Sequence, residues 1–152
     1  MKKLFATTDD LALTWLRIVV GFIVLAHGVQ KLFGWFGGHG PAAVMESFQK
    51  WFGLPPALTM LVILADSVGA FLLILGLGTR VMAGAITAVM IGAIALVHGK
   101  WGFYMNWYSQ PRGEGYEFHL LILAITLLLV VRGGGRWSLD RWIHERLPGK
   151  VG

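Results

Sequence analysis

Four apolar segments follow one another along the chain, and the polar residues gather between them. The segments cover about residues 11–33, 57–78, 81–98 and 116–131. A helix needs roughly 20 mostly apolar residues to cross about 30 Å of hydrocarbon, so the first three segments qualify and the fourth is short for a span. The alternating segments of a membrane β-barrel do not occur in the pattern. We therefore predict an all-α integral membrane protein, built as a four-helix bundle.

An amphipathic segment follows the last apolar one, over about residues 138–147. Ser138 is a typical N-cap residue, and it stands directly before the segment. Apolar side chains fall on one face of the expected helix and charged side chains on the other, which is typical of a helix lying on a membrane surface. We expect a C-terminal interfacial helix on the inner leaflet, within a single membrane domain that covers residues 1–152.

Composition supports a membrane protein and excludes several other classes. Of the 152 residues, 56% are apolar and 14% charged, against about 45–50% and about 25% in soluble domains. The net charge of +5 is placed at the ends of the apolar segments, where it faces anionic lipid, so we expect the lipid bilayer and not nucleic acid as the partner. The chain has no cysteine, which excludes disulfides and thiol redox catalysis.

The distribution of Lys and Arg predicts the orientation in the membrane. With four spans, both termini share one side with the short turn at residues 76–80. That side carries eight of the 13 basic residues, the opposite side carries four, and Arg17 lies within the first span. By the positive-inside rule, we expect a multi-pass protein of the cytoplasmic (inner) membrane with both termini in the cytoplasm.

Small and aromatic residues predict how the bundle packs and what covers it. Gly84, Ala88 and Gly92 recur at four-residue spacing in the third segment, which favours close contact with a neighbouring helix. The two outer connections, residues 34–56 and 99–115, are long and aromatic. Trp and Tyr favour the membrane interface, so we expect an aromatic belt. The alternative is that these connections fold back as lids.

Two ionisable residues fall inside the expected spans, where each costs at least about 2.5–3.5 kcal/mol. Arg17 lies six residues from the inner start of the first span, and Asp66 nine residues from the outer start of the second. The resulting axial offset is about 7 Å at 1.5 Å per residue, so we expect an intramembrane Arg17–Asp66 ion pair. The alternative for Arg17 is to extend to the inner headgroups, whereas Asp66 must be paired, hydrated or protonated.

A second polar group gathers at the outer ends of three segments, beneath the aromatic connections. It consists of His27, Gln30, Lys31, His98, Glu117 and His119, with Trp101 and Trp107 beside them. Such side chains can donate hydrogen bonds and protons to quinone carbonyls, and indole rings can pack on a quinone face. Imidazole and carboxylate can also ligate a metal, but the spacing has no compact metal signature and we assign no metal site. A haem site, which the pattern favours least, and merely solvated side chains are the other interpretations left open.

Five short motifs follow in order along about residues 11–143. They are Leu16-Arg-Ile-Val-Val-Gly21, His27-Gly-Val-Gln-Lys-Leu-Phe-Gly34, Leu75-Gly-Leu-Gly-Thr-Arg80, Glu117-Phe118 and Gly134-Gly-Arg-Trp-Ser-Leu-Asp140. This ordered set resembles the DoxX/DoxD family of small bacterial and archaeal membrane proteins. One departure is Asp66, where members often have Glu.

The resemblance implies a four-helix protein of the cytoplasmic membrane. Some members are linked to thiosulfate:quinone oxidoreductase or terminal oxidase complexes, and others to oxidative-stress assemblies. It favours a quinone-linked redox or oxidative-stress-associated subunit with redox partner proteins, in a homo-oligomer or complex, and leaves open whether the chain is an enzyme. In this hypothesis the catalytic candidates are Glu117, His119 and His27, and the quinone-binding candidates are His27, Gln30, Lys31, His98, Trp101 and Trp107. The alternative is a non-catalytic membrane scaffold or small-solute carrier.

Overall fold

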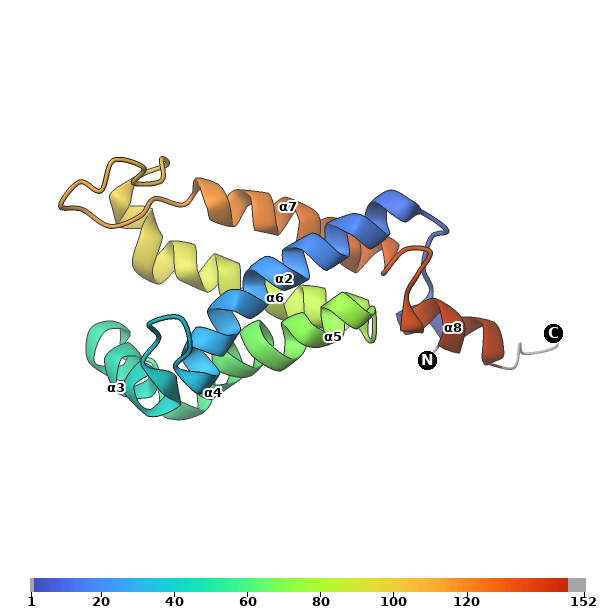
Figure 1. The fold of residues 1–152 in the computed structure, drawn as a ribbon, viewed down its shortest axis with the longest axis horizontal. Coiled ribbons are helices and arrows are strands. Elements are labelled where there is room, and N and C mark those ends of the chain that lie inside the picture. Colours follow the sequence, from blue (N-terminus) through green and yellow to red (C-terminus); the bar gives the residue numbers. More distant parts are fainter. Residues whose placement is uncertain (1, 148–152) are drawn as a thin grey trace.

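The structure, a computed structural model, describes residues 2–147, and these residues form an all-helical bundle (Figure 1). The α-helices are α1 (Lys2–Phe5), α2 (Leu11–Phe33), α3 (Gly40–Phe52), α4 (Pro56–Leu64), α5 (Ala70–Leu75), α6 (Thr79–Ala93), α7 (Glu117–Arg132) and α8 (Leu139–Arg146). Two π-helical turns, η1 (Ala65–Gly69) and η2 (Ile94–His98), and a 3₁₀ turn, η3 (Gly99–Trp101), extend or join them. None of the described residues forms a strand, so the predicted all-α class is confirmed.

Three helical segments are long and apolar enough to cross a membrane. They are α2 with 23 residues, the continuous segment Pro56–Leu75 with 20 residues, and Thr79–Trp101 with 23 residues. Helix α7 has 16 residues, about 24 Å at 1.5 Å per residue, which is shorter than the hydrocarbon layer. All four segments begin and end within three residues of the apolar segments seen in the sequence, because each ends at a glycine, a proline or a polar turn.

Helix α2 joins the two halves of the bundle. It packs against η1 and α5 on one side and against α7 on the other, while α6 and α7 lie along each other (Figure 1). Val20, Val24, Leu73, Ile86 and Leu129 form the buried core between them. The buried Thr87 hydroxyl of α6 also donates to the Thr126 hydroxyl of α7 at 2.9 Å, a polar link of the kind that joins membrane helices.

Arg17 is 1% exposed and bonds to the backbone at the end of the bundle where α8 lies. Its guanidinium donates to the carbonyl oxygens of Leu73 (2.8 Å), Gly134 (2.9 Å), Trp137 (2.6 Å) and Ile74. Carbonyls at the end of a helix such as α5 lack a full set of intrahelical partners. The structure does not form the expected Arg17–Asp66 ion pair, because these carbonyls satisfy Arg17 and Asp66 has another partner.

Helix α8 is attached to the turn between α5 and α6. The Asp140 carboxylate is 1% exposed and accepts hydrogen bonds from the backbone N–H groups of Gly78 and Thr79, both at 2.7 Å. Ser138 caps α8 as expected, since its hydroxyl accepts from the Arg141 N–H at 3.2 Å. Helices α1 and α8 contact each other at the same end of the molecule (Figure 1). The described parts nearest the two termini therefore lie together.

Helix α3 occupies the connection at residues 34–56, where the apolar pattern predicts only an aromatic belt or a lid. Pro41 stands in its first turn, where a missing N–H costs nothing, and Gly53 ends it with φ of 66°. None of its residues is fully buried. It packs against α4 and the end of α2, opposite α8 (Figure 1). The second connection, after η3, is irregular.

Candidate functional site

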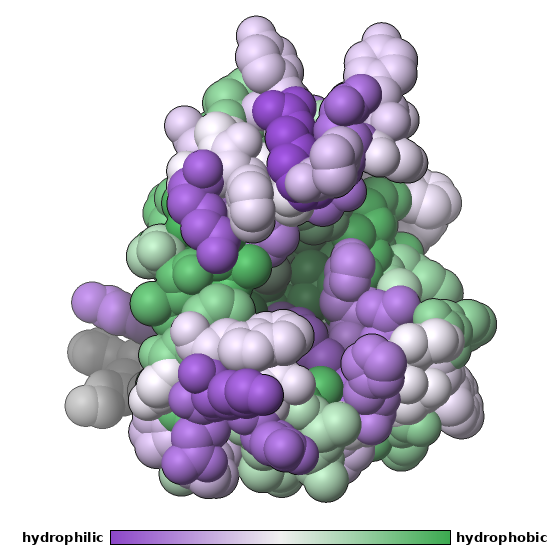
Figure 2. Space-filling model, turned by 90° about the vertical axis from the view of Figure 1, so that its left-hand side faces the viewer, coloured by the Kyte–Doolittle hydropathy of each residue, from purple (hydrophilic) through white to green (hydrophobic). Residues whose placement is uncertain are grey.

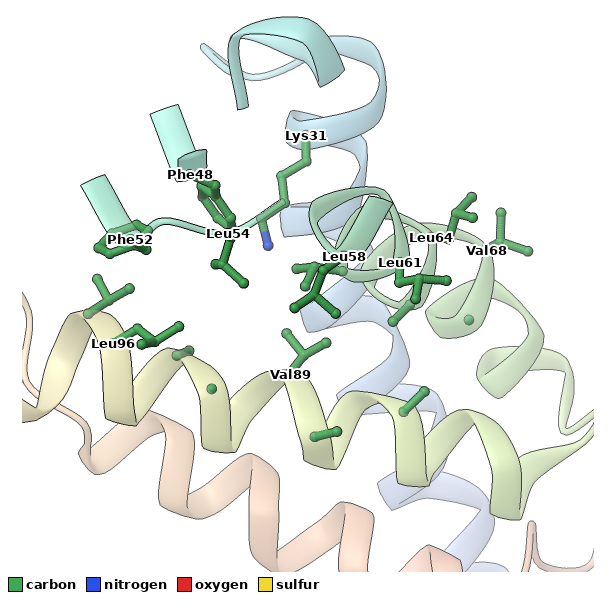
Figure 3. Close-up of a pocket in the computed structure, with 18 of the residues that line it drawn as sticks. Lys31, Phe48, Phe52, Leu54, Leu58, Leu61, Leu64, Val68, Val89 and Leu96 are labelled. Carbon is green, nitrogen blue, oxygen red and sulfur yellow. The ribbon is translucent and has the colours of Figure 1, made fainter. Parts of the chain in front are cut away.

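An apolar groove of about 720 Å³ opens between α6 on one side and α3, α4 and η1 on the other (Figure 3). Its walls include Phe48, Phe52, Leu58, Leu61, Val89 and Leu96. This volume lies within the range of about 300–1,000 Å³ that is typical of small-molecule pockets. Seen from the end where α3 lies, the molecule shows a hollow with hydrophobic walls between α3 and the part formed by η2, η3 and the following loop (Figure 2).

Lys31 is the one ionisable residue among those that line the groove. It comes from the last turn of α2, and its side chain points between α3 and α4 (Figure 3). Its ammonium group donates to the Oδ2 atom of Asp66. The Lys31 side chain is 25% exposed, whereas that of Asp66 is 1% exposed. The groove therefore has one polar end in an otherwise apolar lining.

Asp66 is held behind Lys31 by close contact between α2 and η1. Gly28 of α2 lies against the backbone of Asp66, and a Cβ at this glycine would overlap the Asp66 carbonyl group. Lys31 follows Gly28 by three residues and so lies on the same face of α2. The second carboxylate oxygen of Asp66, Oδ1, is buried and has no hydrogen-bond partner among the described residues. Single π-helical turns such as η1 occur frequently at functional sites.

The small residues of α6 form part of the groove. A Cβ added at Gly84 would lie 4.0 Å from the Val130 side chain of α7, so at this point the expected helix packing is found. Farther along the stripe, Ala88 and Gly92 line the groove, and a Cβ at Gly92 would meet nothing within 4 Å. The stripe is therefore a packing face only in part, because Ala88 and Gly92 face the groove and not a neighbouring helix.

Three histidines, His27, His98 and His119, form a separate cluster between α2, η2 and α7. The rings of His98 and His119 have centroids 4.1 Å apart, and His27 lies 6.3 Å from Phe118. His98 Nδ1 is 2.8 Å from the carbonyl oxygen of Glu114. His119 is 7% exposed, and its Nδ1 atom has no partner among the described residues. Residues 2–147 contain no group of three or more His, Asp or Glu side chains placed to hold a metal.

The remaining candidates hold the outer connections in place. The Trp107 Nε1–H donates to Glu117 Oε1 at 3.2 Å, and the Gln30 amide donates to the Phe36 carbonyl oxygen at 3.2 Å. The Lys100 ammonium lies 5.0 Å from the centre of the Trp101 ring. Among all the candidate binding residues, only Lys31 lines the groove. The structure thus divides the single predicted site into a groove and a histidine cluster.

Comparison with known proteins gives a family and a set of relatives. A family model described as DoxX matches residues 12–99. A Bacillus subtilis (strain 168) protein named "Putative oxidoreductase CatD" is 28% identical over 133 residues, which are 86% of this chain and 85% of that protein. The "Uncharacterized membrane protein Rv3486" of Mycobacterium tuberculosis is 30% identical over 146 residues, with 86% and 80% covered. No solved structure matches the chain. The lining residues of the groove, from Lys31 to Val97, all fall within the matched range.

Proposed function

This chain belongs to the DoxX family of membrane proteins, and we propose that it binds a lipophilic quinone in the groove as a subunit of a quinone-linked redox or oxidative-stress system. The observation that carries the proposal is the groove itself, with apolar walls and the single ammonium group of Lys31 at one end. A quinone combines an apolar ring and tail with two carbonyl oxygens that accept hydrogen bonds. The groove offers a complementary surface to both parts.

The Lys31 ammonium group can donate hydrogen bonds to a ligand in the groove. It carries three N–H bonds and uses one on Asp66. Lys31 makes no other side-chain hydrogen bond within the described part of the chain, so its remaining N–H bonds can donate to a carbonyl oxygen of a ligand in the groove. In a low-dielectric environment such a hydrogen bond is stronger than in water. Lys31 would therefore orient the quinone ring, and the walls of α4 and α6 would hold its tail.

The similarity to a protein named as an oxidoreductase supports a redox context. This chain has no cysteine, so it has no thiol with which to exchange electrons. We propose that a partner protein supplies or takes the electrons, and that this chain holds the quinone. His27, Glu117 and His119 lie outside the groove lining, and we propose a role for them in proton exchange at the outer surface.

Quinone binding can be tested on the purified protein in lipid nanodiscs. Native mass spectrometry would measure the occupancy of added decylubiquinone in the wild type, in Lys31→Met and in Ala88→Phe, a change that fills the groove from α6. We expect both variants to lower the occupancy about tenfold, by loss of a charge-assisted hydrogen bond in one and of space in the other. Lys100→Met is the matched control, since Lys100 is exposed and lies outside the groove lining.

Two outcomes would contradict the proposal. A wild-type protein without bound quinone would favour the alternative of a non-catalytic scaffold or solute carrier. An occupancy that falls in His27→Ala and Glu117→Gln but not in Lys31→Met would place the quinone at the histidine cluster.

A further inference from the structure

We infer that Asp66 makes the groove selective for ligands with an uncharged, hydrogen-bond-accepting head group, and that acidic amphiphiles such as fatty acids are excluded. The inference rests on the proposed binding site and defines the class of ligand that this site takes. It makes Asp66, a residue outside the lining, the one that determines specificity.

The polar end of the groove has no net charge. Lys31 is the one ionisable lining residue, and its bonded partner is the Asp66 carboxyl group. The two side chains together carry no net charge, wherever the shared proton lies between them. An apolar cavity that ends in a neutral pair offers no compensation for a negative head group.

Burial of a ligand carboxylate at this end of the groove is unfavourable. Burial of a charge is unfavourable unless the charge is paired and hydrogen-bonded. If Lys31 left Asp66 to bind a fatty acid carboxylate, Asp66 would be the uncompensated charge instead. A ketone or quinone oxygen needs only a donor, so it binds Lys31 without breaking the pair.

Asp66 is fixed in its position. Its side chain is 1% exposed, and the backbone beside it is in contact with Gly28 of α2. Its Oδ1 atom is buried without a partner among the described residues, so the carboxylate depends on Lys31 for its stabilisation. The pair is therefore a fixed part of the site.

A competition experiment tests the selectivity. The protein in nanodiscs receives equal concentrations of decylubiquinone and oleate, and native mass spectrometry gives the ratio of the two bound masses. We expect the wild type to favour the quinone. In Asp66→Asn the Lys31 charge is uncompensated, and the ratio should shift at least about tenfold toward oleate. The double variant Lys31→Gln with Asp66→Asn has no charge at this point, so its oleate occupancy should not exceed that of the wild type.

A second variant does not disturb the buried carboxylate. Leu58 lines the groove on α4 and is 45% exposed, so Leu58→Lys adds an uncompensated positive charge to the wall and should also shift the ratio toward oleate. A wild type that prefers oleate, or a ratio unchanged in both Asp66→Asn and Leu58→Lys, would overturn the inference. Either result would overturn the selectivity alone and would leave the groove as the binding site. A wild type that binds neither compound, or occupancy unaffected by Ala88→Phe, would instead overturn the proposed function.

Discussion

Arg17, Asp66 and Asp140 are each 1% exposed, and each obtains its partners in a different way. Arg17 donates to backbone carbonyls, Asp140 accepts from backbone N–H groups at the start of α6, and Asp66 bonds to the side chain of Lys31. The first two contacts satisfy helix ends, which otherwise leave polar groups without partners. The third satisfies no helix end and lies beside the groove, which supports the role in specificity that we propose for Asp66 but not for the other two residues.

Arg17 should be essential for stability. Arg17→Met removes the donors to four carbonyl oxygens and leaves these groups in a buried position, so we expect the free energy of unfolding to fall by about 3 kcal/mol. Denaturation in mixed detergent, followed by circular dichroism, would measure the change. Arg112→Met, in the outer loop where the side chain is exposed, should have almost no effect. Equal stability of the two variants would show that water or lipid replaces the Arg17 contacts.

Asp9 should make the attachment of the N-terminal segment dependent on pH. Hydrogen bonds from Arg141 and Arg136 lower the pKa of Asp9 from its ordinary value of 3.8. A lowered pKa in the folded state stabilises the fold above the ordinary value, and this contribution is lost as the pH falls through the lowered one. The difference in stability between wild type and Asp9→Asn should thus stay constant from pH 5 to 8 and decrease below about pH 4. A difference that persists unchanged at pH 2 would contradict the assignment.

At the scale of elements, the apolar pattern predicts the spanning helices well because length and composition decide them. Helix α3 has no fully buried residue. Its side chains therefore show no clear division into a buried and an exposed face, and the helix could not be distinguished from the aromatic connection around it. The Arg17–Asp66 pair was expected from depth along straight, parallel helices. In the structure α2 crosses the bundle obliquely (Figure 1), and Lys31, in the last turn of α2, bonds to the Asp66 carboxylate.

The sequence contained one signal for the observed partner. Gly28 follows His27 and precedes Lys31 by three positions, and a glycine on a spanning helix often marks close approach of a second backbone. The cavity could not be predicted in this way. A stripe such as Ala88 and Gly92 is equally compatible with a neighbouring helix and with empty space, and only the path of α4 decides between them.

The contact between α2 and η1 should make the protein sensitive to substitution at Gly28 but not at Gly92. In Gly28→Ala the new methyl group overlaps the Asp66 backbone, so we expect a loss of about 2 kcal/mol in the free energy of unfolding and a lower decylubiquinone occupancy. In Gly92→Ala the methyl group enters open space and should change stability by less than about 1 kcal/mol. Similar losses in both variants would mean that the close approach at Gly28 is not specific.

At the scale of the whole molecule, the groove and the membrane orientation are connected. Helix α3, η2 and the start of α7 lie at one end, and α1 and α8 lie together at the other (Figure 1). By the sequence count, eight of the 13 basic residues are expected on the side of the two termini. By the positive-inside rule, we predict that α8 lies in the cytoplasm and that the polar end of the groove lies near the outer surface.

Because the chain has no cysteine, single cysteines can report this orientation directly. Gln110→Cys lies in the exposed outer loop and Glu145→Cys on the exposed face of α8. In spheroplasts of a bacterial host, a membrane-impermeant maleimide should label the first variant at once and the second only after the membrane is permeabilised. The reverse pattern would place Lys31 and the quinone head group on the cytoplasmic side. In that case any redox partner would have to meet the quinone from within the cell, so the labelling result also decides on which side such a partner should be sought.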